Sequence, residues 1–255
     1  EGAEYDDKSN IAVEFRNVSF RYVNVNVLEN INLKINRGET IGIIGATGSG
    51  KSTLVNLIPR FYDSSEGEIY VGGKNVKQYR LDELRNKVGI VQQKAVLFSG
   101  TVTDNLRMGK ADAQQSEIEK ACEIAQAAEF IPRLENGYET KISQSGSNLS
   151  GGQRQRLTIA RVLVKKPQIL ILDDSASALD YATDAALRSA IKESTGDTTV
   201  IIVSQRINTV KNADRIIVLD DGFIVGEGVH EELLENCDVY REIAVSQEQA
   251  AKRRK

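Results

Sequence analysis

The fold is decided by ETIGIIGATGSGKSTLVNLI, residues 39–58. This stretch begins as an apolar, strand-like run, passes through a glycine-rich turn and ends in a helical pattern, which is how an α/β nucleotide-binding unit starts. The turn, GATGSGKS at residues 45–52, fits G-x-x-x-x-G-K-[ST], in which glycines let successive backbone N–H groups point at phosphate oxygens. The start of the helix adds positive potential, Lys51 is expected to reach the outer phosphates, and the Ser52 hydroxyl is expected to bind magnesium. The residues predicted to line this phosphate site are Gly45, Ala46, Thr47, Gly48, Ser49, Gly50, Lys51, Ser52 and Thr53.

A second motif supplies a metal ligand. QILILDD, residues 168–174, is a continuous apolar run that ends in two aspartates. Such a run suits a strand buried on both faces of a parallel sheet, and the strand would carry Asp173 to its carboxyl end, where a carboxylate can hold magnesium directly or through water. A strand-end aspartate can also simply cap a helix, but a phosphate loop in the same chain favours the metal role. Together the two motifs predict a P-loop NTPase.

The composition allows a full hydrophobic core and does not favour a nucleic-acid-binding protein. The chain has 255 residues, of which 40% are hydrophobic and 5% aromatic, and its net charge is −3. A length of about 250 residues fits one large domain or two small ones. Without a basic excess or a cationic stripe, nucleic acid is not expected as a partner. Cys122 and Cys237 are far apart and in no C-x-x-C pattern, so we expect ordinary thiols in a reducing compartment.

The two ends of the sequence are typical of connecting segments. Residues 1–10 are predicted to be a polar linker, and residues 246–255 a polar, basic tail. The first residue is Glu1 and the single methionine is Met108, so we expect the chain to be a domain of a longer protein. No apolar run approaches the roughly 18 residues needed to cross a bilayer, and we expect no membrane span in this chain.

The remaining pattern predicts one domain over residues 11–245. IAVEFRNVSFRY and VLENINLKI near its start alternate with period two, which predicts an antiparallel sheet. Residues from about 112 to 165 have helical spacing without strand-like runs, which predicts a helical insertion. TTVIIVS predicts a second buried strand, and DRIIVLDDGFIVGEGV predicts a hairpin around DDG that is followed by a helix from His230 onward.

A third motif, LSGGQRQR at residues 149–156, lies just before ILILDD and resembles the signature of ATP-binding cassette (ABC) proteins. VLFSGTVTDNL, residues 96–106, further resembles the exporter branch of that family. The resemblance covers essentially the whole chain, with its motifs in the family's order. It implies an α/β fold with a RecA-like P-loop NTPase core, an N-terminal antiparallel β subdomain and a helical subdomain inserted at about residues 94–165. It also implies ATP and Mg²⁺ as ligands.

The resemblance implies roles for residues outside the phosphate loop. Tyr22 in SFRY corresponds to the aromatic residue that stacks on adenine, and Gln93 in VQQ to the glutamine that contacts magnesium, with Gln92 as an alternative. Ser150 and the glycines after it precede a helical run and offer a hydroxyl and open N–H groups to an anion. In the family two domains dimerise head to tail, so each signature closes over the phosphate held by the partner's loop. The residues implied to contact nucleotide are Ser150, Gly151, Gly152 and Gln153, together with Asp180 in SALD at 177–180.

Three positions depart from the family's pattern. Asp174 stands where the family usually has the glutamate that activates the attacking water, and its shorter side chain withdraws the carboxylate by about 1.5 Å. Gln205 replaces the histidine that contacts the γ-phosphate, and an amide can hydrogen-bond a phosphate oxygen but cannot become cationic or pass a proton. Gln144 occupies the position of a glutamate that interacts with transmembrane coupling helices. The chain's single histidine, His230, is expected to be a structural residue at a helix start.

These departures predict a site that binds Mg-ATP but hydrolyses it slowly, as in the degenerate half of a heterodimeric exporter. Displacing a catalytic group by about 1 Å can cost roughly a hundredfold in rate, and a positioned general base is worth about 10²–10⁴. The expected partners are a second ATP-binding domain, from a different subunit, and the transmembrane domains of a multidrug exporter, at the cytoplasmic face of the cell membrane. The catalytic candidates are Asp174, Gln205 and Gln93, and the magnesium ligands are Ser52, Gln93 and Asp173.

Two alternatives stay open at this point. One is a homodimeric exporter ATPase in which Asp174 suffices as the base, so that both sites are equally active. The other is a soluble ABC protein that acts as an ATP-switched binding module in repair or translation. The exporter-like stretch at residues 96–106 and the lack of an initiator methionine argue against the soluble protein.

Overall fold

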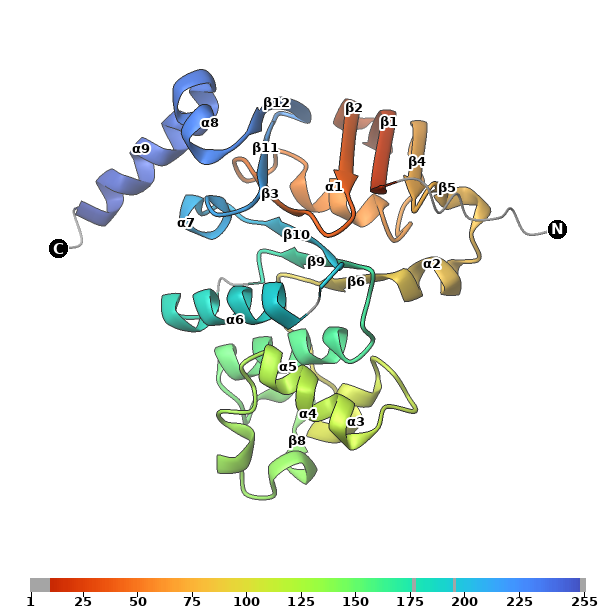
Figure 1. Ribbon diagram of the computed structural model, residues 1–255, viewed down its shortest axis with the longest axis vertical. Coiled ribbons are helices and arrows are strands. Elements are labelled where there is room, and N and C mark those ends of the chain that lie inside the picture. Colours follow the sequence, from red (N-terminus) through yellow and green to blue (C-terminus); the bar gives the residue numbers. More distant parts are fainter. Residues whose placement is uncertain (1–9, 176–177, 195, 253–255) are drawn as a thin grey trace. The chain divides into compact units, whose positions relative to one another are not determined.

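The computed structural model describes residues 10–175, 178–194 and 196–252 of the chain. The described residues form two compact units, one made of the segments up to Val88 and from Asp197 onward, and the other made of Gly89–Gly196. Each unit is described by itself below, with the labels of Figure 1.

The first unit opens with the predicted antiparallel sheet. Its strand order is β2-β1-β4-β5, and β1 is antiparallel to both β2 and β4. Val13 of β1 lies opposite Ile35 of β2 and Val71 of β4, and all three side chains are buried. From Ile31 to Asn36 of β2, buried and exposed residues alternate as the sequence predicts, whereas the residues from Ala12 to Phe15 of β1 are all buried. The strands are β1 (Ile11–Tyr22), β2 (Val25–Asn36), β4 (Glu66–Val71) and β5 (Lys74–Asn75).

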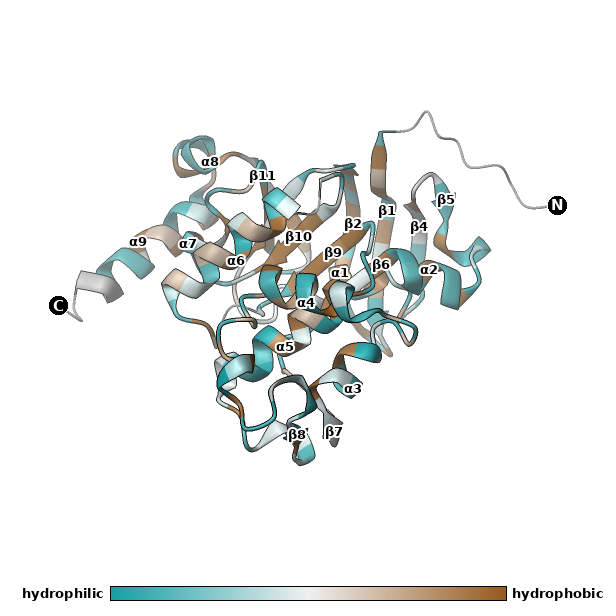
Figure 2. Ribbon diagram, turned by 60° about the horizontal axis from the view of Figure 1, so that its bottom comes forward, coloured by the Kyte–Doolittle hydropathy of each residue, from teal (hydrophilic) through white to brown (hydrophobic). Residues whose placement is uncertain are grey.

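A mixed sheet forms the centre of the first unit, in the order β12-β11-β3-β10. Strand β3 (Thr40–Ile44) is parallel to β10 (Thr199–Val203) and to β11 (Arg215–Asp220), whereas β12 (Phe223–Gly228) is antiparallel to β11. All five residues of β10 are buried, and the strand is brown in Figure 2, as a strand covered on both faces should be. The predicted buried strand and the predicted hairpin at β11 and β12 are therefore confirmed.

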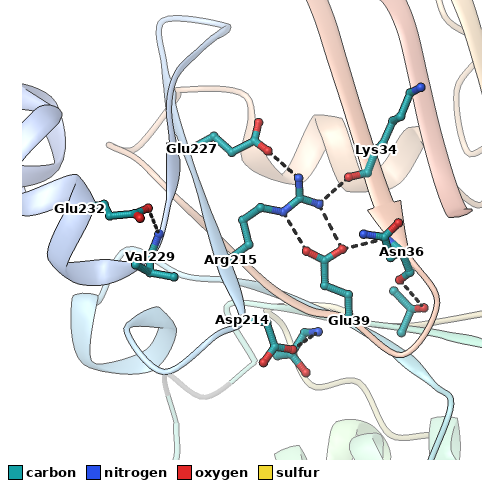
Figure 3. Close-up of polar contacts among 10 residues, drawn as sticks. Lys34, Asn36, Glu39, Asp214, Arg215, Glu227, Val229 and Glu232 are labelled. Carbon is teal, nitrogen blue, oxygen red and sulfur yellow. Dashed lines mark hydrogen bonds and ion pairs between the residues drawn. The ribbon is translucent and has the colours of Figure 1, made fainter. Parts of the chain in front are cut away.

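An ion-paired network fastens the mixed sheet at the start of β3 and β11 (Figure 3). Arg215 donates from Nε to Glu39 Oε1 at 2.8 Å and from a terminal nitrogen to Glu39 Oε2 at 3.1 Å. The same guanidinium bonds the carboxylate of Glu227 on β12 and the carbonyl of Lys34 on β2. One largely buried cation thus joins segments that lie up to 181 positions apart in the sequence.

Helices complete the first unit. Helix α1 (Lys51–Leu57) follows β3, and α2 (Leu81–Lys87) precedes the second unit. The chain ends in α7 (Ile207–Val210), α8 (His230–Asn236) and α9 (Asp238–Lys252), where α7 contacts β3, β10 and α9 (Figure 1). The helix predicted from His230 onward is confirmed as α8, and helix α9 includes residues 246–252 of the segment described above as a tail.

The second unit consists mainly of helices. Strand β9 (Ile169–Asp173) is fully buried and neighbours β6 (Val88–Val91), and α5 (Gly151–Leu163) packs on α3 (Val102–Arg107) and α4 (Gln115–Ile124). One feature differs from the prediction of a strand-free insertion, because Lys141–Ile142 (β8) pairs with Gly100–Thr101 (β7), and two residues are too few to show an alternating pattern. The other elements are α6 (Tyr181–Ser194) and the 3₁₀ turns Val76–Gln78, Ile131–Arg133, Gly137–Glu139 and Gln144–Gly146, the first of which belongs to the first unit.

In the part of the chain that the structure describes, no helix is both long and apolar enough to cross a bilayer.

Candidate functional site

The phosphate loop connects β3 to α1 through a backbone that only glycine allows. Gly50 is the residue before α1 and has a φ of 97°, in the left-handed region that side-chain-bearing residues avoid. A Cβ placed on Gly45 would lie 2.0 Å from the carbonyl oxygen of Leu219, at the end of β11. The loop therefore has to pass the sheet edge without side chains at these two positions, which is why the glycine spacing of the motif is tied to its shape.

Lys51 places its ammonium group inside the loop. Its Nζ donates hydrogen bonds to the carbonyl oxygens of Gly45 at 2.9 Å and Ala46 at 2.6 Å, and to Ser49 Oγ at 3.3 Å. The side chain is buried, whereas Ser52 next to it is exposed. The buried ammonium group can donate hydrogen bonds to phosphate oxygens. The accessible hydroxyl of Ser52 can provide an oxygen ligand for a magnesium ion.

Gln205 lies directly against the phosphate loop. It follows β10, and its Oε1 accepts a hydrogen bond from Thr47 Oγ1 at 3.2 Å. Both side chains are exposed. The structure thus places Gln205, the residue that replaces the family's histidine, in contact with the phosphate loop.

An aromatic cluster surrounds Tyr22 at the end of β1. The rings of Phe20 and Tyr22 lie edge to face with centroids 4.7 Å apart, and Tyr62 lies edge to face with Tyr22 at 5.4 Å. Tyr22 and Tyr62 are 40% and 44% exposed, so ring surface remains open for stacking. Sequence reasoning missed Tyr62, for which the available signal was a pair of adjacent aromatic residues, FY at residues 61–62, just after the phosphate-loop helix.

The second unit brings Gln93 and Asp174 together. Gln93 follows β6, and its Nε2 donates a hydrogen bond to Asp174 Oδ2 at 3.2 Å. Asp173, the last residue of β9, is buried, and Asp174 turns the chain with a φ of 45°, a left-handed conformation that aspartate tolerates better than most residues.

The signature residues begin α5 through a capping box. Ser150 Oγ accepts a hydrogen bond from the Gln153 N–H at 3.2 Å, and Gln153 Oε1 accepts one from the Ser150 N–H at 2.9 Å. The Ser150 hydroxyl proton remains to be donated to a ligand, because the cap uses the oxygen only as an acceptor. Gly152 lies close to the Ala178 carbonyl, which a Cβ would approach to 3.3 Å.

Asp180 caps α6 in this structure. Its Oδ1 accepts from the Thr183 N–H at 2.9 Å and its Oδ2 from Thr183 Oγ1 at 2.8 Å, and these bonds lower the pKa of the carboxyl below its usual value. Ser177 of the same SALD motif lies outside the described residues. Gln144 is exposed at the start of a 3₁₀ turn.

His230 and the two cysteines, which the sequence analysis also named, lie among structural contacts. His230 Nδ1 lies 2.7 Å from the hydroxyl of Tyr240, which is fully buried, so the single histidine joins α8 to α9. Both cysteines are buried, and burial raises the pKa of the Cys122 thiol to about 12.

The glycine-rich loop between a parallel strand and a helix, with an aspartate at the end of another buried strand, defines a P-loop nucleotide-binding protein. The family described as ABC transporter matches residues 28–177, more than half of the chain. The chain belongs to the ABC transporter family, and it corresponds to an ATP-binding domain of exporter type.

Known proteins similar to the chain come from the same family. YgaD of Bacillus subtilis (strain 168), named as a candidate multidrug export ATP-binding/permease protein, is 44% identical over 233 residues, which are 91% of this chain and 40% of YgaD. The ABC transporter ATP-binding protein YfiB of the same organism, named as uncharacterized, is 46% identical over 94% of this chain and 42% of its own length. A solved structure of a bacterial Atm1-family ABC exporter with ATP bound matches with a TM-score of 0.90 and 37% identity, over 94% of this chain and 42% of the exporter chain. The chain therefore spans about two fifths of the length of these relatives.

Proposed function

We propose that the chain is the ATP-binding domain of a membrane exporter, and that its own site binds Mg-ATP tightly but hydrolyses it slowly. The observation that carries this proposal is the combination of a complete phosphate loop with Asp174 and Gln205 at the two positions where the family has its glutamate and histidine. The binding residues are all present, and the substitutions fall on the residues that act on the attacking water and the γ-phosphate.

Nucleotide binding would rest on the loop and on the aromatic pair. Lys51 and the loop N–H groups bind the phosphates, and Tyr22 stacks on adenine with Tyr62 supporting its ring. Ser52, Asp173 and Gln93 hold magnesium, which when bound neutralises charge on the phosphate oxygens. The location of the Lys51 ammonium inside the loop supports this assignment, because a phosphate oxygen can replace the carbonyl oxygens that the ammonium now contacts.

Slow hydrolysis would follow from the short side chain of Asp174 and from the neutral amide of Gln205. The Asp174 carboxylate ends about 1.5 Å short of where a glutamate carboxylate would lie, and a displacement of about 1 Å can cost roughly a hundredfold in rate. The same carboxylate already accepts a hydrogen bond from Gln93. Gln205 contacts Thr47 through a neutral amide, so it can orient a phosphate oxygen without supplying a positive charge or a proton.

The partner would be a second ATP-binding domain that carries the active site. Ser150, Gly151, Gly152 and Gln153 would close over the nucleotide of that partner, and Asp180 would lie next to the same interface. The name of YgaD, which combines ATP binding with a permease, supports transmembrane domains as the other partner and a position at the cytoplasmic face of a membrane. Export of drug-like compounds is proposed on the same basis.

The homodimeric ATPase is the second candidate function, because Asp174 still supplies a carboxylate at this position and a carboxylate can act as a general base. Measuring ATP binding and steady-state hydrolysis of the chain across protein concentration separates the two. We expect Mg-ATP binding with almost no turnover at any concentration, and we expect Lys51→Ala to weaken binding by about tenfold to a hundredfold because a charge-assisted hydrogen bond is lost. Lys120→Ala, which removes an exposed lysine of α4, is the control. Brisk turnover that rises steeply with protein concentration would instead support the homodimer.

A further inference from the structure

The C-terminal helix α9 bonds directly to the backbone that carries Gln205. Gln247 of α9 donates from Nε2 to the Gln205 carbonyl oxygen at 2.6 Å, and its Oε1 accepts from the Ile207 N–H at 3.0 Å. One side-chain amide therefore forms hydrogen bonds with the backbone on both sides of the turn between β10 and α7. Gln247 itself is half-buried.

Two side chains bond the backbone of this turn, because Ser204 Oγ accepts a hydrogen bond from the Arg206 N–H at 3.0 Å and Gln247 bonds the residues on either side of Arg206. Helix α7 has four residues, and its N-cap residue, Arg206, makes no side-chain capping bond. The Ile207 N–H is one of the donors that a helix start leaves without an intrahelical partner, and Gln247 satisfies it from another element. The Gln205 carbonyl, two residues earlier, is held by the other end of the same amide.

Helix α9 is anchored to α8 about two turns before Gln247. Tyr240, seven residues before Gln247, is fully buried and bonds His230, while Arg241 donates to the Leu234 and Glu235 carbonyls at the end of α8. Residues seven apart lie on the same face of a helix. Gln247 therefore lies on the same face of α9 as the buried Tyr240.

We propose that Gln247 is a positioning residue, which sets the backbone at Gln205 so that the Gln205 side chain is held at Thr47 of the phosphate loop. The docking of α9 then controls how Gln205 meets the γ-phosphate. This inference rests on the proposed function only for the γ-phosphate role of Gln205. The positioning itself consists of the contacts from Gln247 to the turn and from Gln205 to Thr47.

The test begins without nucleotide. In the ¹⁵N-labelled chain, the side-chain amide signal of Gln205, assigned by its loss in Gln205→Ala, should shift or broaden in Gln247→Met, which keeps the length of the side chain but removes both hydrogen bonds. Gln249→Met, an exposed glutamine of the same helix, should leave the signal in place. An unchanged Gln205 signal in a folded Gln247→Met protein would overturn the proposal whether or not the chain binds ATP.

The second readout compares ATP with ADP. Gln247→Met should weaken ATP binding about fivefold while ADP binding changes less than twofold, because only ATP has the γ-phosphate that Gln205 contacts. Added to Gln205→Ala, the same substitution should have no further effect on ATP binding, since the residue through which it acts is gone. Additive losses, or equal losses for ATP and ADP, would mean that Gln247 has a general structural role. Gln247→Glu, which keeps the acceptor for Ile207 but loses the donor to Gln205, provides an intermediate variant, and thermal denaturation checks that each variant folds.

Discussion

At the scale of single residues, the structure explains what the aspartate at position 174 changes. Its backbone is left-handed, and its carboxylate accepts a hydrogen bond from Gln93 at 3.2 Å. Aspartate is among the few residues that adopt this conformation readily. The carboxylate is thus hydrogen-bonded within the second unit, and a glutamate side chain would extend about 1.5 Å further. The length of the side chain follows from the residue type and could be predicted from the sequence. The hydrogen bond with Gln93 could be seen only in the structure.

The buried thiol of Cys122 gives a prediction of pH dependence. Burial raises its pKa from 9.0 to about 12, so between these values the folded chain keeps the proton that the unfolded chain releases. The unfolded state then binds fewer protons, and the free energy of unfolding must fall as the pH rises above about 9. Urea denaturation at pH 7 and pH 10 should show this loss, and Cys122→Ala should reduce the difference between the two pH values. An equal difference in wild type and variant would contradict the assignment.

At the scale of elements, short-range patterns predicted the strands but not the contacts that fasten them. Period-two alternation was enough for β1 and β2, and the continuous apolar runs were enough for β9 and β10, because each pattern lies within one element. The pair Arg215–Glu39 joins residues 176 positions apart, and nothing in either local sequence indicates the other. Gln247 is invisible to sequence reasoning for the same reason, since its partners lie 40 and 42 positions away.

The Arg215 network should be a main support of the mixed sheet. Arg215→Ala leaves the Glu39 carboxylate, 12% exposed, without its bidentate partner, and we expect the free energy of unfolding to fall by about 2–4 kcal/mol, somewhat less than for a fully buried pair. Arg215→Lys should recover only part of this loss, because an ammonium cannot make the two parallel bonds of a guanidinium. Chemical denaturation measures both variants.

A matched surface pair controls for charge in that experiment. Arg80 and Asp82 also form an ion pair, but their side chains are 82% and 66% exposed. Arg80→Ala should therefore leave stability unchanged within error. If Arg215→Ala were as harmless as Arg80→Ala, the network would not be a support of the sheet.

At the scale of the whole molecule, the predicted site residues share one structural rule. Gly45 follows β3, Gln205 follows β10, Gln93 follows β6 and Asp174 follows β9, so each lies just beyond the carboxyl end of a strand, where α/β proteins bind ligands. The motifs could be located from the sequence because phosphate and magnesium require particular residue types at particular spacings. These motifs specify a nucleotide site, and they contain no pattern that indicates a transported compound or a protein partner.

We propose, as stated above, that Asp174 and Gln205 make the site of this chain bind ATP without rapid hydrolysis. The most direct test is steady-state Mg-ATP hydrolysis by the double variant Asp174→Glu, Gln205→His beside the wild type, with ATP affinity measured on both. We predict similar affinities and a rise in turnover of at least tenfold in the double variant, because a restored base alone is worth about 10²–10⁴ where its geometry is right. Rapid turnover by the wild type, or no gain in the variant with ATP binding intact, would contradict the account.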